Sequence, residues 1–223
     1  MTKLAIFDCD GTLVDSGATI FAALKLALEA HGRTVPPPSE ARRVVGLSLF
    51  EAFEMIVPGA SADDIDTMSA TYRRAFQDMR ARGQVEEPLF EGIAELIEAM
   101  AADGWALAVA TGKSDRGLRY CLAAHGLGDR FVSLQTADRH PSKPHPAMAL
   151  AAMAEAGAKP KHTVMIGDTG WDMGCARGAG IGAIGVGWGY HDEAELLASG
   201  AQFVAADPAD VLAMATSLIG GTR

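Results

Sequence analysis

The sequence predicts an α/β protein in which a doubly wound, Rossmann-like parallel sheet carries an inserted helical cap domain. Short, almost continuously apolar segments recur along the chain, and helix-like segments separate most of them. Strands buried on both faces of a parallel sheet are apolar throughout, and their alternation with helices is typical of a doubly wound sheet. One long stretch after the first such segment has helical patterns only, which predicts the insertion.

Six segments have the length and apolar character of buried strands, and polar or glycine-containing turns follow them. A helix is predicted over Gly92–Ala102, because its apolar residues recur at helical spacing and Gly104 follows as a stop. In such a fold, polar site residues collect at the carboxyl ends of the strands. The predicted strands are Leu4–Phe7, Trp105–Ala110, Phe131–Leu134, Thr163–Ile166, Ala183–Val186 and Gln202–Val204.

The helical stretch predicts a cap at residues 17–83, inserted into an α/β core of residues 1–16 and 84–223. Ser48 followed by Glu51 has the pattern of a capping box, and Ser61 followed by Asp64 begins a further helix. Turn-forming proline and glycine residues separate the helices. The alternative is a single mixed core. The position of the helices directly after the first strand and its acidic motif favours the cap.

Composition limits the possible partners. The formal net charge of −9 over 223 residues argues against nucleic acid and anionic membranes as partners. No stretch approaches the roughly 20 apolar residues of a membrane span, and the N-terminus lacks the pattern of a secretory signal. Cys9, Cys121 and Cys175 lack metal-site spacing, which favours reduced thiols in the cytoplasm. A monomer or a homodimer is expected.

An acidic motif, Asp8-Cys9-Asp10-Gly11-Thr12, follows the first predicted strand. Two carboxylates at the end of a buried strand are costly unless they serve a reaction or bind a cation. Alternate strand residues share a face, so Asp8 and Asp10 can converge while the Cys9 side chain packs on the opposite side. Gly11 permits a sharp turn that brings backbone amides close to a ligand.

This motif and three later ones resemble the four signatures of the haloacid dehalogenase superfamily, most of whose members are phosphatases. The four match in the family's order, and each lies at a predicted strand end or loop. The Trp188-Gly189-Tyr190 segment resembles a stretch in the phosphoglycolate phosphatase-like branch. The four motifs are Asp8–Leu13, Ala110-Thr111-Gly112, Ser142–Pro146 with Lys143, and Gly167–Asp172 with Asp168.

The resemblance implies a Mg²⁺-dependent reaction on a small phosphate ester. Asp8 would be the nucleophile, and Asp10 the acid that protonates the leaving oxygen and then the base that activates water. Thr111 would hold phosphoryl oxygens and Lys143 would offset their charge. The metal ligands would be the Asp8 and Asp168 carboxylates and the Asp10 carbonyl, with Asp172 acting mainly through water. The substrate-binding set would be Cys9, Gly11, Thr12, Gly112, Arg43 and Gly46.

Several functions within and outside the family are distinguishable. Dehalogenases lack the second acid, so Asp10 argues against them. β-Phosphoglucomutase-like mutases usually carry a Glu-Asp pair in the fourth motif, where this chain has Gly167-Asp168-Thr169. A binding protein without activity would be expected to have lost Asp8, Asp10 or Lys143. A phosphatase is therefore favoured, with 2-phosphoglycolate as a candidate substrate whose carboxylate could pair with Arg43. A mutase and a pyrophosphatase stay open as alternatives.

Overall fold

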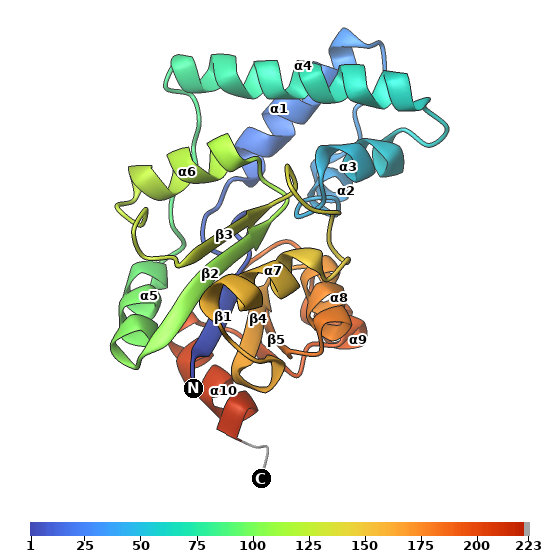
Figure 1. Ribbon diagram of the computed structural model, residues 1–223. Coiled ribbons are helices and arrows are strands. Elements are labelled where there is room, and N and C mark those ends of the chain that lie inside the picture. Colours follow the sequence, from blue (N-terminus) through green and yellow to red (C-terminus); the bar gives the residue numbers. More distant parts are fainter. Residues whose placement is uncertain (221–223) are drawn as a thin grey trace.

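The computed structural model describes residues 1–220, which contain a six-stranded sheet in which all neighbouring strands are parallel. The strand order is β3-β2-β1-β4-β5-β6, so the chain builds outward on one side of β1 and then returns to the other side. The α/β, doubly wound fold predicted from the sequence is confirmed (Figure 1). The strands are β1 (Lys3–Phe7), β2 (Trp105–Thr111), β3 (Ser133–Thr136), β4 (Thr163–Gly167), β5 (Gly182–Val186) and β6 (Phe203–Ala205).

Helices cover both faces of the sheet. The α5, α6 and α10 helices pack with one face, and α7, α8 and α9 pack with the other. Among the described residues, no helix has both the length and the apolar character needed to cross a bilayer. These helices are α5 (Ile93–Ala102), α6 (Asp115–Ala124), α7 (Ala147–Ala156), α8 (Gly170–Ala179), α9 (Glu193–Ser199) and α10 (Pro208–Gly220), with a 3₁₀ turn η1 (Pro160–His162) before β4.

The central strand β1 shows why an apolar run was needed here. Leu4 and Ile6 belong to the cluster beneath α7 and α8, whereas Ala5, Phe7 and Cys9 belong to the cluster beneath α5 and α6. Side chains alternate between the two faces of a strand, and both faces of this sheet are covered. From Leu4 to Phe7 the strand therefore carries no polar residue.

The third strand begins two residues later than predicted. Phe131 and Val132 precede β3, and polar residues form its end. Gln135 donates to the Ser133 hydroxyl at 2.7 Å, and Thr136 donates to Asp115 at 2.9 Å. Because these polar side chains are satisfied by neighbours at the edge of the sheet, the strand extends beyond the apolar run that the sequence prediction followed.

Four helices, α1 (Gly17–Ala30), α2 (Pro38–Arg42), α3 (Leu49–Ile56) and α4 (Ala62–Ala81), form a separate layer beyond the carboxyl ends of the strands (Figure 1). Their apolar residues pack into a cluster of their own rather than into the two clusters of the sheet. The members of this cluster are Leu24, Ala27, Leu28, Ala41, Phe53, Ile65 and Met68.

The two predicted helix starts in this layer differ in outcome. At α4, the Ser61 hydroxyl accepts the Asp64 N–H at 3.1 Å, as predicted. At α3, Ser48 precedes the helix but forms no side-chain cap, so the predicted capping box is wrong. The backbone N–H of Ser48, which Glu51 would bond in such a box, donates instead to the Ser142 hydroxyl at 2.8 Å. A contact with the α/β core thus replaces the local cap.

The two chain segments that join this helical layer to the sheet run side by side. Val14 and Leu89 form an antiparallel bridge. Asp15 N–H donates to Pro88 O at 2.8 Å, and Phe90 N–H donates to Leu13 O at 3.1 Å. The outgoing and returning segments therefore form one hydrogen-bonded ribbon.

Candidate active site

The register of the central strands brings three of the predicted motifs together. Phe7, the last residue of β1, lies opposite Val109 of β2 and Ile166 of β4. Asp8 follows directly, and its N–H donates to Ile166 O at 2.9 Å. Thr111 and Asp168 each lie two residues beyond these partners, so they emerge at the same edge. The order of the strands reverses between β1 and β4, which is where doubly wound sheets form a crevice for ligands.

Three buried carboxylates, from Asp8, Asp168 and Asp172, form the centre of this crevice. Each offers one oxygen, and these oxygens lie within 4.8 Å of one another. Asp168 is held by two donors, the Thr12 hydroxyl at 2.8 Å and the Tyr190 N–H at 3.0 Å. Such a concentration of buried acid requires nearby positive charge.

Lys143 supplies one buried cation. Its ammonium lies 2.8 Å from Asp8 Oδ2, and it donates to Asp172 Oδ1 at 2.6 Å and to Ala110 O at 3.2 Å. Burial disfavours the ammonium, but Asp172 and Asp8 outweigh it and raise the pKa of Lys143. The lysine therefore stays charged between the two carboxylates.

One lysine does not balance three carboxylates. Burial raises the pKa of Asp8 to about 7, with Lys143 opposing and Asp172 adding to the shift. Burial, followed by the charges of Asp172 and Asp8, raises the pKa of Asp168 well above its usual value. Both carboxyls are thus poorly stabilised as anions by the protein alone.

This charge imbalance fits a divalent cation. Asp8 Oδ2 is buried and lacks a well-directed hydrogen bond, although Lys143 is near. The Asp172 carboxylate is more fully engaged, because its Oδ2 accepts the Thr169 N–H at 3.1 Å and hydroxyl at 2.6 Å. Carboxylate oxygens are the ligands that Mg²⁺ prefers, so Asp8 and Asp168 suit direct coordination better than Asp172.

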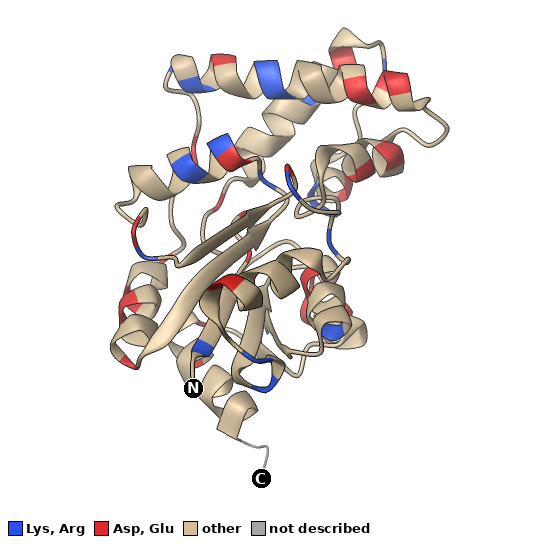
Figure 2. Ribbon diagram, in the orientation of Figure 1, with Lys and Arg blue, Asp and Glu red and all other residues tan. Residues whose placement is uncertain are grey.

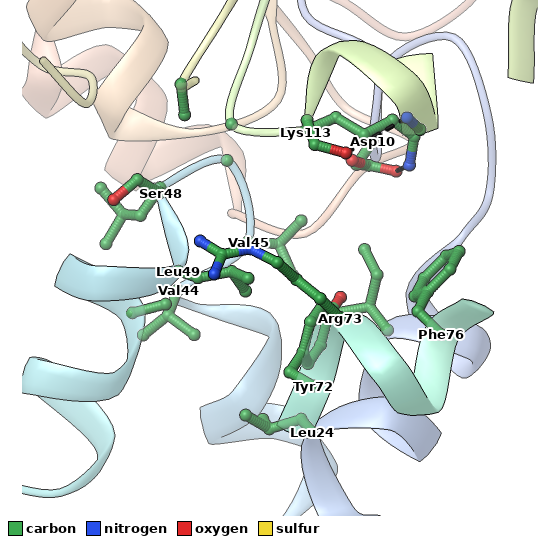
Figure 3. A pocket seen from close by; sticks show the side chains of 18 of the residues that line it. Asp10, Leu24, Val44, Val45, Ser48, Leu49, Tyr72, Arg73, Phe76 and Lys113 are labelled. Carbon is green, nitrogen blue, oxygen red and sulfur yellow. Dashed lines mark hydrogen bonds and ion pairs between the residues drawn. The ribbon is translucent and has the colours of Figure 1, made fainter. Parts of the chain in front are cut away.

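Asp10 lies beside this cluster and is held by residues that the sequence analysis missed. Its Oδ1 accepts the Ser16 hydroxyl at 2.5 Å. The same oxygen accepts the Lys113 ammonium at 2.5 Å (Figure 3). Lys113 also lies 2.9 Å from Glu87 Oε1, and Glu87 Oε2 accepts from Arg80 of α4 at 3.0 Å. A chain of alternating charges therefore runs from Asp10 to the helical layer.

The charge of Lys113 depends on these partners. Burial lowers its affinity for a proton, but Asp10 foremost and also Glu87 more than offset this effect, and the pKa of Lys113 is raised. The available sequence signal was its position directly after Thr111-Gly112 at a strand end. Ser16 lies only six residues after Asp10, but it belongs to none of the four motifs. The role of Glu87 depends on its ion pair with Lys113, a residue in a different segment of the chain.

The second motif meets the helical layer. Thr111 is buried, and its Oγ1 accepts the Lys113 N–H at 3.3 Å, which leaves the hydroxyl proton free to donate. A Cβ at Gly112 would lie 2.3 Å from Leu47 O. Gly46 has φ +91°, and a Cβ there would lie 3.5 Å from Asp8 Oδ2. The segment before α3 therefore lies directly over the cluster, and only glycine permits this approach.

The loop after β1 uses most of its own backbone donors. Cys9 N–H donates to Asp8 Oδ1 at 2.6 Å, and Gly11 N–H donates to Val14 O at 2.9 Å. The Cys9 side chain is buried with its Sγ 4.0 Å from that of Cys121, on the face opposite Asp8. Thr12 meets the cluster through its hydroxyl, which orients Asp168. These residues shape the site more than they offer free donors to a substrate.

The expected contact of Arg43 with a substrate carboxylate stays a prediction, and in this structure Arg43 has other partners. Its exposed guanidinium donates to Glu195 of α9 at 2.6 Å. Its backbone carbonyl accepts from Trp171 Nε1 at 3.2 Å. Arg43 is thus engaged with the α/β core, and it is not among the residues that line the cavity described next.

A cavity of about 650 Å³ lies between the helical layer and the sheet, and Asp10 forms part of its wall. Residues from α1, α3 and α4, from the segment 44–50 and from the β2–α6 region line it. Figure 3 shows Asp10 and Lys113 on one side and the side chains of Tyr72, Arg73 and Phe76 of α4 on the other. The site therefore consists of a buried acidic centre with a roomy chamber next to Asp10.

Comparison with known proteins shows the family to which the chain belongs. Residues 5–186 match the model of the family described as "Haloacid dehalogenase-like hydrolase". The chain is 36% identical to a probable phosphatase, IndB, of Dickeya dadantii, over 98% of this chain and 96% of the relative. It is 30% identical to a phosphoglycolate phosphatase of Agrobacterium fabrum, over 86% of this chain and 83% of the relative.

A solved structure has the same fold. A hydrolase from Pseudomonas syringae superposes with a TM-score of 0.84 at 28% identity, covering 96% of this chain and 97% of that one. The likeness extends over the sheet and the helical layer alike, because almost the full length of each chain is aligned.

Proposed function

Because this chain is a phosphatase of the haloacid dehalogenase-like hydrolase family, we propose that Asp8 attacks the phosphorus atom of a small phosphate monoester. A bond forms between a carboxylate oxygen of Asp8 and phosphorus, and the bond between phosphorus and the ester oxygen breaks. The product is an aspartyl phosphate and an alcohol. The observation that carries this proposal is the burial of Asp8 beside Lys143 and two further carboxylates at one edge of the sheet.

Asp10 handles the protons of both steps. In the first it gives its proton to the departing ester oxygen. In the second it takes a proton from a water that attacks phosphorus, the bond to Asp8 breaks and inorganic phosphate leaves. Its place on the cavity wall supports this role, because the leaving alcohol must lie on the open side of the site.

The remaining residues bind and orient. Lys143 offsets the charge of the phosphoryl oxygens, and the free hydroxyl proton of Thr111 donates to one of them. A bound Mg²⁺, held by the Asp8 and Asp168 carboxylates and the Asp10 carbonyl with Asp172 acting through water, would add positive charge at the transferring group. Residues 17–83 serve as a cap over the α/β core of residues 1–16 and 84–223. The cap excludes water from the reacting phosphate at the carboxyl ends of the strands.

The name of one relative supports a first choice of substrate, and the state of the cysteines supports a location in the cytoplasm. The Agrobacterium fabrum relative makes 2-phosphoglycolate the first ester to test. The three cysteines are buried and free, which is consistent with work in a reducing cytoplasm.

The decisive experiment is release of phosphate from 4-nitrophenyl phosphate and from 2-phosphoglycolate, by wild type, Asp8→Asn and Asp15→Asn. Asp15 is exposed in the same segment and serves as the matched control. Wild type and Asp15→Asn should be active with Mg²⁺ and inactive with EDTA, whereas Asp8→Asn should be inactive. Acid-quenched wild type should carry a hydroxylamine-labile phosphate on the peptide that contains Asp8.

Full activity of Asp8→Asn would overturn the mechanism. Conversion of β-glucose 1-phosphate to glucose 6-phosphate without phosphate release would make the protein a mutase. Preference for inorganic pyrophosphate over every ester would make it a pyrophosphatase.

A further inference from the structure

The cavity next to Asp10 is large for a small metabolite ester. Its volume of about 650 Å³ lies within the roughly 300–1,000 Å³ of sites that hold drug-sized ligands. In 2-phosphoglycolate only a carboxymethyl group extends beyond the phosphate. Such a group would leave most of the cavity filled with water. The space therefore indicates a larger organic part.

The wall of the cavity is mainly apolar on the side of the helical layer. Ile20 and Leu24 come from α1, and Phe53 comes from α3. Figure 3 shows the Leu24 side chain on this side of the cavity. The cluster beneath them is packed by Leu28, Ile65 and Met68, so this wall is a rigid apolar surface. Burying apolar surface here contributes about 25 cal/mol per Å², which only an apolar ligand would gain. Further apolar lining residues include Val44, Val45, Leu47, Leu49, Tyr72 and Phe76.

The same cavity concentrates positive charge in an acidic protein. Its lining has the basic residues Arg73, Arg80, Lys113 and Arg116 but only Asp10 and Asp138 as acids, whereas the whole chain has a net charge of −9. Figure 2 shows basic positions on α4 and α6, the two helices that contribute these arginines. An anionic ligand would be attracted to this cavity.

Most of these cations already have partners, but Arg73 does not. Lys113 pairs with Asp10 and Glu87, Arg80 pairs with Glu87, and Arg116 stacks on Tyr120 at 5.5 Å. Within residues 1–220 the Arg73 guanidinium forms no hydrogen bond or ion pair. In Figure 3 the side chain extends from α4 across the cavity toward the segment that carries Val45 and Leu49. A guanidinium so placed suits a carboxylate or a second phosphate.

We propose that the substrate is a monoester of a largely apolar, ring-sized alcohol that carries an anionic group at its far end, and that Arg73 binds this group. The inference rests on the proposed function, because it places the leaving alcohol on the Asp10 side of the reacting phosphate. The apolar wall holds the body of the alcohol. Arg73 sets specificity from across the cavity without contacting the reacting atoms.

Four esters of primary alcohols separate the two features, because they differ in ring and carboxylate but have similar leaving groups. They are ethyl phosphate, 2-phosphoglycolate, benzyl phosphate and 4-(carboxymethyl)benzyl phosphate. We expect the ring to raise kcat/KM by about a hundredfold, as burial of several carbons in a fitted pocket does. The carboxylate on the ring should raise it about tenfold to a hundredfold more.

Two neighbouring arginines give matched variants. Arg73 lines the cavity, whereas the adjacent Arg74, which is also exposed, does not. Arg73→Ala should abolish the gain from the ring carboxylate, so that the variant hydrolyses the two benzyl esters with similar kcat/KM. Arg74→Ala should behave as wild type with all four esters, and Arg73→Lys should restore part of the gain. The lost gain should appear mainly in KM, because Arg73 is far from the bonds that change.

The outcomes separate the inference from the function on which it rests. If 2-phosphoglycolate is hydrolysed as well as or better than both benzyl esters, the inference fails and the phosphatase mechanism stands. The inference also fails, with the mechanism intact, if Arg73→Ala and Arg74→Ala respond alike. If no ester releases phosphate, the proposed function fails and the inference fails with it.

Discussion

The Lys113 ammonium lies 2.5 Å from the Asp10 carboxylate, and each side chain exposes only 8% of its surface. Glu87, which exposes 6% of its side chain, lies 2.9 Å from the same ammonium. One buried cation therefore holds Asp10, the proposed general acid, and ties it to the segment that returns from the helical layer.

Replacing Lys113 by methionine should affect both stability and catalysis. Two nearly buried carboxylates would lose their cation, which costs about 3–5 kcal/mol when one partner of a buried ion pair is removed. Asp10 would also lose its orientation, which should lower kcat about a hundredfold with little change in KM. Thermal unfolding and steady-state kinetics measure the two effects.

The exposed Lys161 is the matched control, and Lys161→Met should leave both quantities unchanged. Wild-type kcat and stability in Lys113→Met would show that the ion pair with Asp10 has no role.

Removing Lys143 should destabilise the protein more than removing Lys143 together with Asp172. Lys143→Met leaves Asp8 and Asp172 buried without their shared cation. Replacing Asp172 by asparagine in the same chain removes one of the two stranded charges, so part of the lost stability should return, on the order of 1–3 kcal/mol.

Chemical denaturation of wild type, both single variants and the double variant completes the cycle. Additive effects would mean that Lys143 and Asp172 do not stabilise one another.

Metal-free protein should lose stability as pH rises toward neutrality. The pKa of Asp8 is about 7 in the folded protein and 3.8 ordinarily, so the folded state holds this proton more tightly than the unfolded chain. The unfolded chain ionises first as pH rises, and the penalty grows between these two values and is complete above about pH 7. Asp168, whose pKa is also raised, acts in the same direction.

Mg²⁺ should reverse this penalty, because it binds the ionised carboxylates. The rise in melting temperature on adding Mg²⁺ to EDTA-treated protein should therefore be larger at about pH 8 than at about pH 5. Equal rises at both pH values would argue against carboxylate ligands that titrate in this range.

Adding one methyl group at Gly189 should displace Asp168, one of the three buried carboxylates. A Cβ at this position would lie 2.1 Å from the Cβ of Asp168, so either the loop or the carboxylate must move. We expect Gly189→Ala to lower stability by about 2–4 kcal/mol and to weaken Mg²⁺ binding.

Gly128→Ala is the control, since nothing lies within 4 Å of its added methyl group and its φ is ordinary. That change should be neutral or slightly stabilising. Unaltered Mg²⁺ affinity in Gly189→Ala would separate the 187–191 loop from the metal site.

Much of the fold could be predicted because each strand buried on both faces of a parallel sheet is a short, continuously apolar segment of the sequence. The segment before Asp8 is apolar on both faces, and the structure buries Leu4, Ile6, Ala5 and Phe7 accordingly. The third strand was placed incorrectly, because Gln135 and Thr136 satisfy their polar groups at the edge of the sheet. Strand ends thus followed hydrogen bonds rather than hydropathy.

In the candidate site, residues within local motifs could be predicted, whereas residues placed by contacts between distant segments could not. Asp8, Asp168 and Lys143 were identified because they belong to short motifs at strand ends. Lys113 and Glu87 were missed, because their roles depend on ion pairs between residues far apart in the sequence. Lys113 is 103 residues from Asp10 and 26 residues from Glu87. Arg43 pairs with Glu195, a contact that no local pattern could reveal, and its expected contact with the substrate stays a prediction.

The bridged pair of segments around Val14 and Leu89 has a thermodynamic consequence. Two segments joined by hydrogen bonds cannot move independently, which restricts how the helices they carry can move relative to the sheet. Closing over a substrate then removes little orientational entropy, because most of it was already lost when the protein folded. A larger share of the binding free energy of the ester is left to stabilise the transition state.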